Sequence, residues 1–72
     1  MQRGTISKVM TDRGWGFIAT GDGQTDIFLH CRDLALGSGL VWGHDLIGRE
    51  VEFNVVDTAK GPQAVDVRPA RA

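Results

Sequence analysis

Aromatic side chains recur at alternate positions in two short stretches of the sequence. They are Trp15 and Phe17 in "RGWGFIAT" (13–20), and Phe28 with His30 in "DIFLHC" (26–31). Unpaired nucleic-acid bases stack on flat rings, because every base has a π face, and each stacked base contributes roughly 1–3 kcal/mol. If the two stretches are neighbouring strands, these side chains form one contiguous patch, larger than a monomer normally leaves exposed without use.

Basic side chains are predicted at the edge of this patch. Lys8, Arg13 and Lys60 would lie near enough to contact the phosphates of a bound strand. The whole chain gives no such indication, since it has eight Lys and Arg against nine Asp and Glu, a formal net charge of −1. The expected basic rim is therefore local.

The opposite arrangement, with the aromatic rings in the core, is disfavoured. It would expose four aliphatic side chains over two strands and bury His30.

Catalytic and metal-binding groups are sparse. His30 and Cys31 are adjacent on a predicted strand and should point to opposite faces, and His44 is the other soft ligand. The aspartates at 12, 22 and 26 are typical of turns and rims rather than of an acid–base pair. We therefore expect a binding protein that is not an enzyme, with no metal and no cofactor.

The elements that would position the patch are short strands. Ten glycines and two prolines divide the chain, and no stretch of eleven residues has a helical period. Alternation of apolar residues predicts five strands, with turns at 21–25 and 60–63. The predicted strands are 4–10, 14–20, 26–31, 49–56 and 64–68. Five short strands favour a small closed barrel, because closure removes exposed edges.

The aliphatic residues on the other face of these strands would fill the barrel. The predicted core consists of Ile6, Ile18, Ile27, Leu29, Val51, Phe53, Val55, Val65 and Val67.

Length and composition set the remaining limits. At 72 residues the chain is predicted to be one domain, and no apolar run is long enough for a membrane span or a signal peptide. Its single cysteine, Cys31, cannot form an internal disulfide, which fits a reducing compartment. The sequence therefore predicts a soluble cytoplasmic protein that does not bind membranes.

Several segments, in order along nearly the whole chain, resemble the cold-shock domain family. "RGWGFI" (13–18) and "DIFLHC" (26–31) are similar to its paired ribonucleoprotein motifs. The others are "GTISKV" (4–9), "GREVEF" (48–53) and "KGPQAVDV" (60–67). The resemblance implies a single cold-shock domain over residues 1–72, with the all-β fold of a five-stranded antiparallel OB-fold barrel. It also implies binding of single-stranded RNA or DNA, and a role as an RNA chaperone or a regulator of transcription or translation.

The resemblance assigns roles to individual residues. It implies stacking by Trp15, Phe17, Phe28 and His30, a backbone contact by Arg13, hydrogen bonds from base edges to Asp26, and a basic contact by Lys60 beside the bound strand.

Three positions depart from the family pattern. Lys8, Val9 and Cys31 stand where the family has aromatic residues, so three stacking rings are missing and weaker binding or a shorter footprint is expected. Lys8 would partly compensate through a phosphate contact, which makes binding more sensitive to salt.

The segment "ALGSGLVWGHD" (35–45) is longer than the family's usual connection, and two interpretations of it stay open. Either Trp42 reaches over the aromatic patch and stacks on a further base, or Leu40, Val41 and Trp42 form an apolar plug or a self-association contact. A monomer is expected, with exchange of loops or strands between two chains as an alternative. The alternative function is a protein-interaction or self-association module that uses the aromatic face and this loop.

Overall fold

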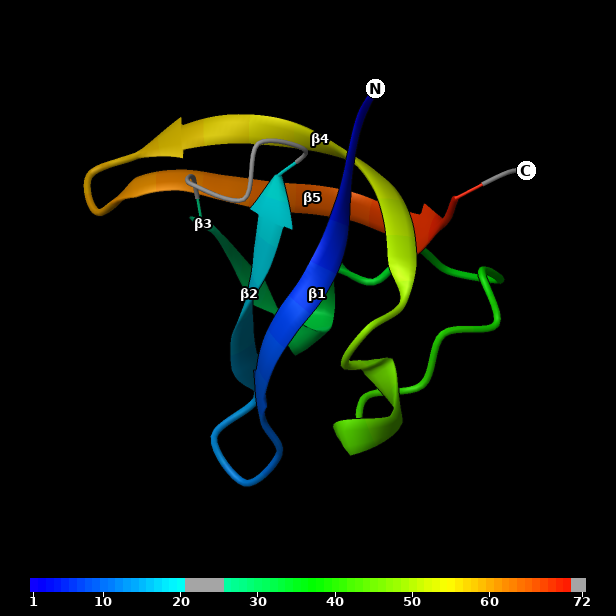
Figure 1. Ribbon diagram of the computed structural model, residues 1–72. Helices are drawn as coiled ribbons and strands as arrows, with labels where there is room; N and C mark the ends of the chain where they lie inside the picture. Colours follow the sequence, from blue (N-terminus) through cyan, green and yellow to red (C-terminus); the bar gives the residue numbers. More distant parts are fainter. Residues whose placement is uncertain (21–25, 71–72) are drawn as a thin grey trace.

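Five short strands and two single 3-10 turns make up the regular structure of residues 1–20 and 26–70, which are the residues that the computed structural model describes (Figure 1). The strands are β1 (Gln2–Met10), β2 (Trp15–Thr20), β3 (Asp26–His30), β4 (Glu50–Thr58) and β5 (Gly61–Pro69), and the turns are η1 (Cys31–Asp33) and η2 (His44–Leu46). The strands form a closed barrel in the order β1-β2-β3-β5-β4, which confirms the predicted all-β barrel. The turn predicted at 21–25 lies outside the described residues. No described helix is long and apolar enough to span a membrane.

The barrel closes through a parallel contact between β3 and β5, which we call the seam. Phe28 lies opposite Gln63, and beyond β3 Leu34 forms a bridge to Val67. The other described pairs, β1–β2, β1–β4, β2–β3 and β4–β5, are antiparallel as expected. A closed ring of five strands cannot alternate direction at every step, so one pair must be parallel.

Apolar side chains from all five strands and from η2 fill the barrel. The buried set comprises Ile6, Val9, Ile18, Ile27, Leu29, Leu46, Val51, Phe53, Ala64 and Val67, which confirms most of the predicted core. Of the two remaining predicted members, Val55 is partly buried and packs against this cluster. The prediction for Val65 is wrong, because Val65 is half-exposed and Ala64 is buried in its place.

An extra residue in β5 explains the error at Val65. Glu52 pairs with Arg68 and Asn54 with Val65, so two steps along β4 match three along β5. Within this bulge Asp66 has a φ of 55°, and the bulge interrupts the alternation of the strand. The side chains of Ala64 and Val67 therefore both point into the barrel although they are three residues apart.

Two alanine substitutions in β5 test this register. Val67→Ala removes a fully buried side chain and is expected to lower the free energy of unfolding by about 2 kcal/mol. Val65→Ala is expected to cost less than half of that, because the Val65 side chain is already partly in water. Urea unfolding followed by fluorescence measures both, and equal losses would contradict the register of β5.

A second bulge, in β1, determines which way Lys8 points. Ile6 pairs with Ile18 and Lys8 with Phe17, so two steps along β1 match one along β2, and Ser7 is the extra residue. Lys8 is therefore exposed, and Val9 is buried with 4% of its surface accessible. The prediction that Val9 replaces a stacking ring is wrong, because its side chain belongs to the core.

Candidate nucleic-acid interface

The aromatic residues of β2 and β3 lie together on the outer surface of the barrel. Antiparallel pairing places Trp15 opposite His30 and Phe17 opposite Phe28. All four side chains are half-buried, whereas their aliphatic neighbours Ile18, Ile27 and Leu29 are buried. The arrangement with the rings in the core and the aliphatic residues outside is therefore wrong.

The indole ring of Trp15 and the phenyl rings of Phe17 and Phe28 pack on one another in a defined geometry. Trp15 and Phe28 are nearly parallel, with an interplanar angle of 24° and centroids 6.3 Å apart. Phe17 stands edge-on to both, at 79° and 5.7 Å from Trp15 and at 80° and 6.1 Å from Phe28. Mutual packing limits the rotation of each ring, so flat apolar faces are available for stacking without large rearrangement.

The glycines on either side of Trp15 are required by the local backbone. A Cβ on Gly16 would lie 2.0 Å from the carbonyl oxygen of Lys8, because β2 approaches β1 closely beside the Ser7 bulge. Gly14 has a φ of 76° and closes the β1–β2 turn, where its N–H donates to the Met10 carbonyl oxygen at 2.9 Å. Both glycines therefore serve to place the Trp15 ring.

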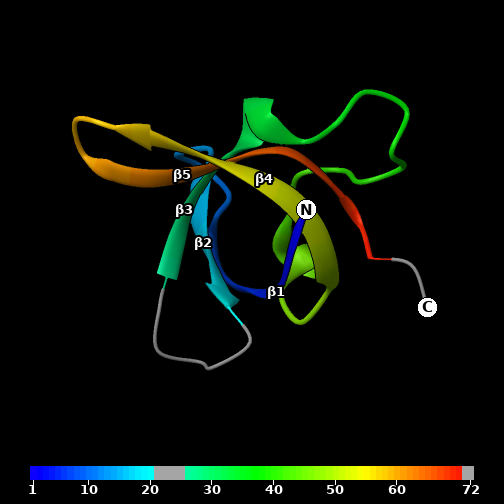
Figure 2. The same cartoon turned by 90° about the horizontal axis from the view of Figure 1, so that it is seen from above.

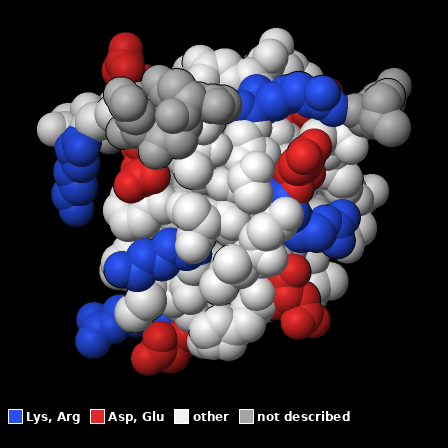
Figure 3. All heavy atoms as spheres, in the orientation of Figure 1, with Lys and Arg blue, Asp and Glu red and all other residues white. Residues whose placement is uncertain are grey.

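Lys8 lies over the indole of Trp15. Its Nζ is 5.5 Å from the ring centroid, a cation–π contact at an exposed position. A cation thus occupies the edge of the aromatic surface at the position where the family pattern has a further ring. Acidic and basic side chains are interspersed around an uncharged area on the face that carries β1 and β2 (Figure 3).

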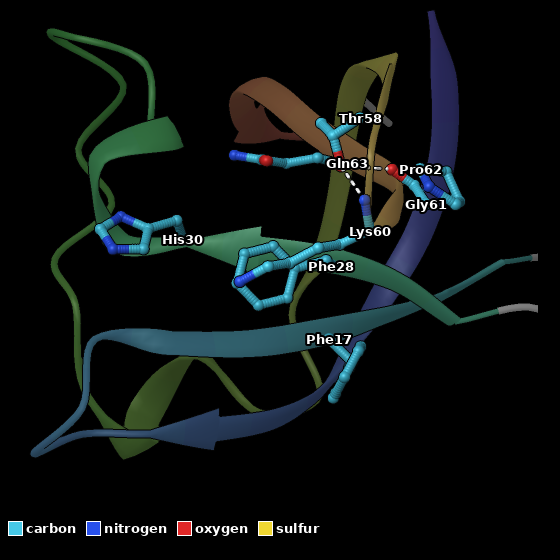
Figure 4. A pocket seen from close by; sticks show the side chains of 8 residues that line it. All are labelled: Phe17, Phe28, His30, Thr58, Lys60, Gly61, Pro62 and Gln63. Carbon is cyan, nitrogen blue, oxygen red and sulfur yellow. Dashed lines mark hydrogen bonds between the residues drawn. The ribbon is translucent and has the colours of Figure 1, made fainter.

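A groove of about 480 Å³ extends from the rings of β2 and β3 to the β4–β5 hairpin (Figure 4). Its lining residues are Phe17, Phe28, His30, Thr58, Lys60, Gly61, Pro62 and Gln63. Thr58 fixes the hairpin: its hydroxyl donates to the Gly61 carbonyl oxygen at 2.8 Å and accepts from the Lys60 N–H at 3.2 Å. The hairpin therefore holds an exposed cation beside two aromatic rings.

Two polar side chains of the groove are held by η1. The Nε2 of Gln63 donates to Asp33 Oδ2 at 2.7 Å, across the seam. The Nδ1 of His30 accepts from the backbone N–H of Arg32 at 3.2 Å. Asp33 and Gln63 were not predicted as site residues. Gln63 falls in the turn predicted at 60–63, whereas residues 61–63 belong to β5.

The relation of His30 to Cys31 differs from the prediction. Cys31 is the first residue of η1 instead of the last residue of a strand, so the two side chains do not point to opposite faces. The distance from Cys31 Sγ to His30 Nδ1 is 3.8 Å. No cluster of three or more His, Cys, Asp or Glu side chains suited to a metal ion occurs among residues 1–20 and 26–70.

Of the remaining predicted site residues, Arg13 and Asp26 are exposed, Arg13 in the β1–β2 turn and Asp26 at the start of β3. Trp42 does not line the groove beside Phe17 and Phe28. It packs with Leu40 against the core and lines a separate cavity of about 220 Å³, and its Nε1 is buried. The segment between η1 and η2 lies on the side of the barrel away from the β4–β5 hairpin (Figures 1 and 2).

The packing of Leu40 and Trp42 against the core favours the apolar plug over stacking of Trp42 on a base. Val41, expected to be part of that plug, is 79% exposed.

Comparisons with a family model, with known proteins and with solved structures all find similarity to cold-shock domains. The family model described as 'Cold-shock' DNA-binding domain matches residues 2–70. A "Probable cold shock protein A" of Mycolicibacterium smegmatis is 40% identical over 68 residues, which cover 94% of this chain and 97% of that protein. A "Cold shock-like protein" of Aquifex aeolicus is 38% identical over 66 residues, covering 92% and 90%. Among solved structures, the drosophila Unr CSD456 matches with a TM-score of 0.73 and 26% identity, covering 97% of this chain and 26% of that one.

Proposed function

Because the chain belongs to the cold-shock domain family of nucleic-acid-binding proteins, we propose that it binds single-stranded RNA or DNA, without catalysis, in the groove beside β2 and β3. The observation that carries this proposal is the cluster formed by Trp15, Phe17 and Phe28. These rings are half-exposed on adjacent strands, with the faces of two of them nearly parallel. Such a surface suits consecutive unpaired bases, since a duplex hides its base faces.

Three cations are proposed to contact the phosphates of the bound strand. Lys60 lines the groove, Lys8 lies over Trp15, and Arg13 is exposed in the β1–β2 turn. Asp26, exposed at the start of β3, is proposed to accept hydrogen bonds from base edges. With a net charge of −1 and few cations in the site, stacking would supply most of the affinity.

The proposed role in the cell follows from the preference for unpaired bases. Stacking is tolerant of sequence, and a protein that binds bases in this way lowers the free energy of the unpaired state of a transcript. We therefore propose that the protein acts as an RNA chaperone or as a regulator of transcription or translation.

A fluorescence titration tests the proposed function. Oligouridine and oligothymidine of about six nucleotides are expected to quench tryptophan emission to saturation, because a base stacks on Trp15. The logarithm of the binding constant is expected to fall with the logarithm of salt concentration with a slope of about −2, since each of three phosphate contacts contributes about −0.7.

The position of Trp42 provides the control for this signal. A Trp15→Phe variant keeps a stacking ring and should bind with most of the quenching lost, because Trp42 packs on the core away from the groove. Absence of binding at low salt would reject the proposal and leave the protein-interaction module as the function to test.

A further inference from the structure

The single turn η1 holds two polar groups of the groove, His30 two residues beyond Phe28 in β3 and Gln63 opposite Phe28 in β5. His30 precedes the turn, and its Nδ1 accepts from the Arg32 N–H at 3.2 Å. Gln63 lies opposite Phe28 in the seam, and its Nε2 donates to Asp33 Oδ2 at 2.7 Å. Both side chains line the groove (Figure 4).

These two hydrogen bonds fix which atoms are left for a ligand. A carboxylate has only acceptors, so the amide nitrogen of Gln63 must face Asp33, and the Oε1 acceptor is the group left over. Because Nδ1 of His30 accepts from the Arg32 N–H, Nε2 is the ring nitrogen left for a ligand. The bond between Gln63 and Asp33 is partly buried and charge-assisted, and such bonds are roughly twice as strong as neutral ones.

We infer that Asp33 is a positioning residue that makes Gln63 a fixed hydrogen-bond acceptor beside the Phe28 ring. This inference rests on the proposed function. A base stacked on Phe28 must then present an N–H on its Watson–Crick edge to Gln63 Oε1. All four unmodified bases carry such an N–H, so this subsite tolerates sequence. It rejects a base in which a methyl group has replaced that hydrogen, because Gln63 Oε1 is then left without a donor and the methyl group takes up the donor's place.

Three oligonucleotide probes separate this hydrogen bond from stacking. They are oligouridine, oligo-N3-methyluridine, in which the N–H is blocked, and oligo-5-methyluridine, which carries its methyl group away from that edge. The wild-type protein is expected to bind the N3-methyl probe about tenfold or more weaker than oligouridine, as for a lost hydrogen bond with an unpaired partner. It is expected to bind the 5-methyl probe as well as oligouridine.

Asp33→Ala tests the role of the carboxylate. Without Asp33 the Gln63 amide can rotate, and the ratio of affinities for oligouridine and its N3-methyl form is expected to fall by about threefold or more, with Asp26 accounting for the discrimination that is left. Asp45→Ala is the matched control, because it removes the same charge from η2, outside the groove, and should keep the wild-type ratio. Any general gain in affinity from the lost negative charge appears in both variants and cancels in the ratio.

The outcomes separate the two proposals. A folded Asp33→Ala protein that keeps the wild-type ratio, or a wild-type ratio near one, overturns the inference about Asp33 and leaves the proposed function intact. Failure of the wild-type protein to bind any probe overturns the proposed function itself. If Asp33→Ala does not fold, Asp33→Asn replaces it: the asparagine is the same size but can also donate to Gln63 Oε1. Its ratio should be intermediate, and an unchanged ratio in this folded variant also overturns the inference.

Discussion

Replacing Phe17 and Phe28 together by alanine is expected to weaken binding of oligouridine at least about 30-fold, because each lost stacking contact costs roughly 1–3 kcal/mol. Both side chains line the groove and are only half-buried. The core beneath them consists of other residues, so the double variant should keep a cooperative unfolding transition. Titration at low salt measures the binding, and thermal unfolding measures the fold.

A control for this pair removes two large apolar side chains elsewhere. Leu36 and Val41 are almost fully exposed between η1 and η2, and the Leu36→Ala/Val41→Ala variant should bind oligouridine like the wild type. If the variant without Phe17 and Phe28 bound normally, the aromatic surface would not be the binding site. If it unfolded, these rings would be part of the structural core.

Gly16→Ala is expected to destabilise the barrel by about 3 kcal/mol or more, which for a domain of this size lowers the melting temperature by roughly 10 °C or more. The added Cβ would lie 2.0 Å from the Lys8 carbonyl oxygen and 3.2 Å from the Cα of Val9. These are backbone atoms, so β1 and β2 must separate to relieve the clash. Calorimetry or circular dichroism measures the shift.

Gly43→Ala is the matched control for this substitution. A Cβ on Gly43 meets nothing within 4 Å, and its φ of 169° is ordinary extended backbone. The same chemical change should therefore leave the melting temperature nearly unaltered. Similar losses in the two variants would mean that the close approach of β1 and β2 is not what the glycine at position 16 permits.

The barrel was predictable from the sequence because alternation of apolar residues is a local property. The alternation in 15–20, 26–30 and 51–55 correctly placed most of the core. The errors at Val9 and Val65 share a cause, since each lies close to a strand position where one extra residue is inserted, at Ser7 in β1 and around Asp66 in β5. Neither residue type marks a bulge by itself, so the register became known only from the pairing of the strands.

The aromatic part of the candidate site was predictable for the same reason, whereas its polar part was not. Asp33 and Gln63 are 30 residues apart, and they meet because β3 and β5 close the barrel. Trp42 likewise lies in a segment without periodicity, so only its contacts with the core distinguish a plug from a stacking residue. Contacts between distant segments depend on topology, which local patterns do not specify.

The seam between β3 and β5 affects how stable the barrel is when no ligand is bound in the groove. It is parallel, it is short, and the Asp33–Gln63 hydrogen bond crosses it beside the groove. A ligand bound in the groove would contact both sides of the seam, and its binding free energy would add to that of barrel closure. Without such a ligand, opening at the seam would expose the edges of two strands, and such edges pair readily with other chains. Occupancy of the groove would then protect the protein against aggregation.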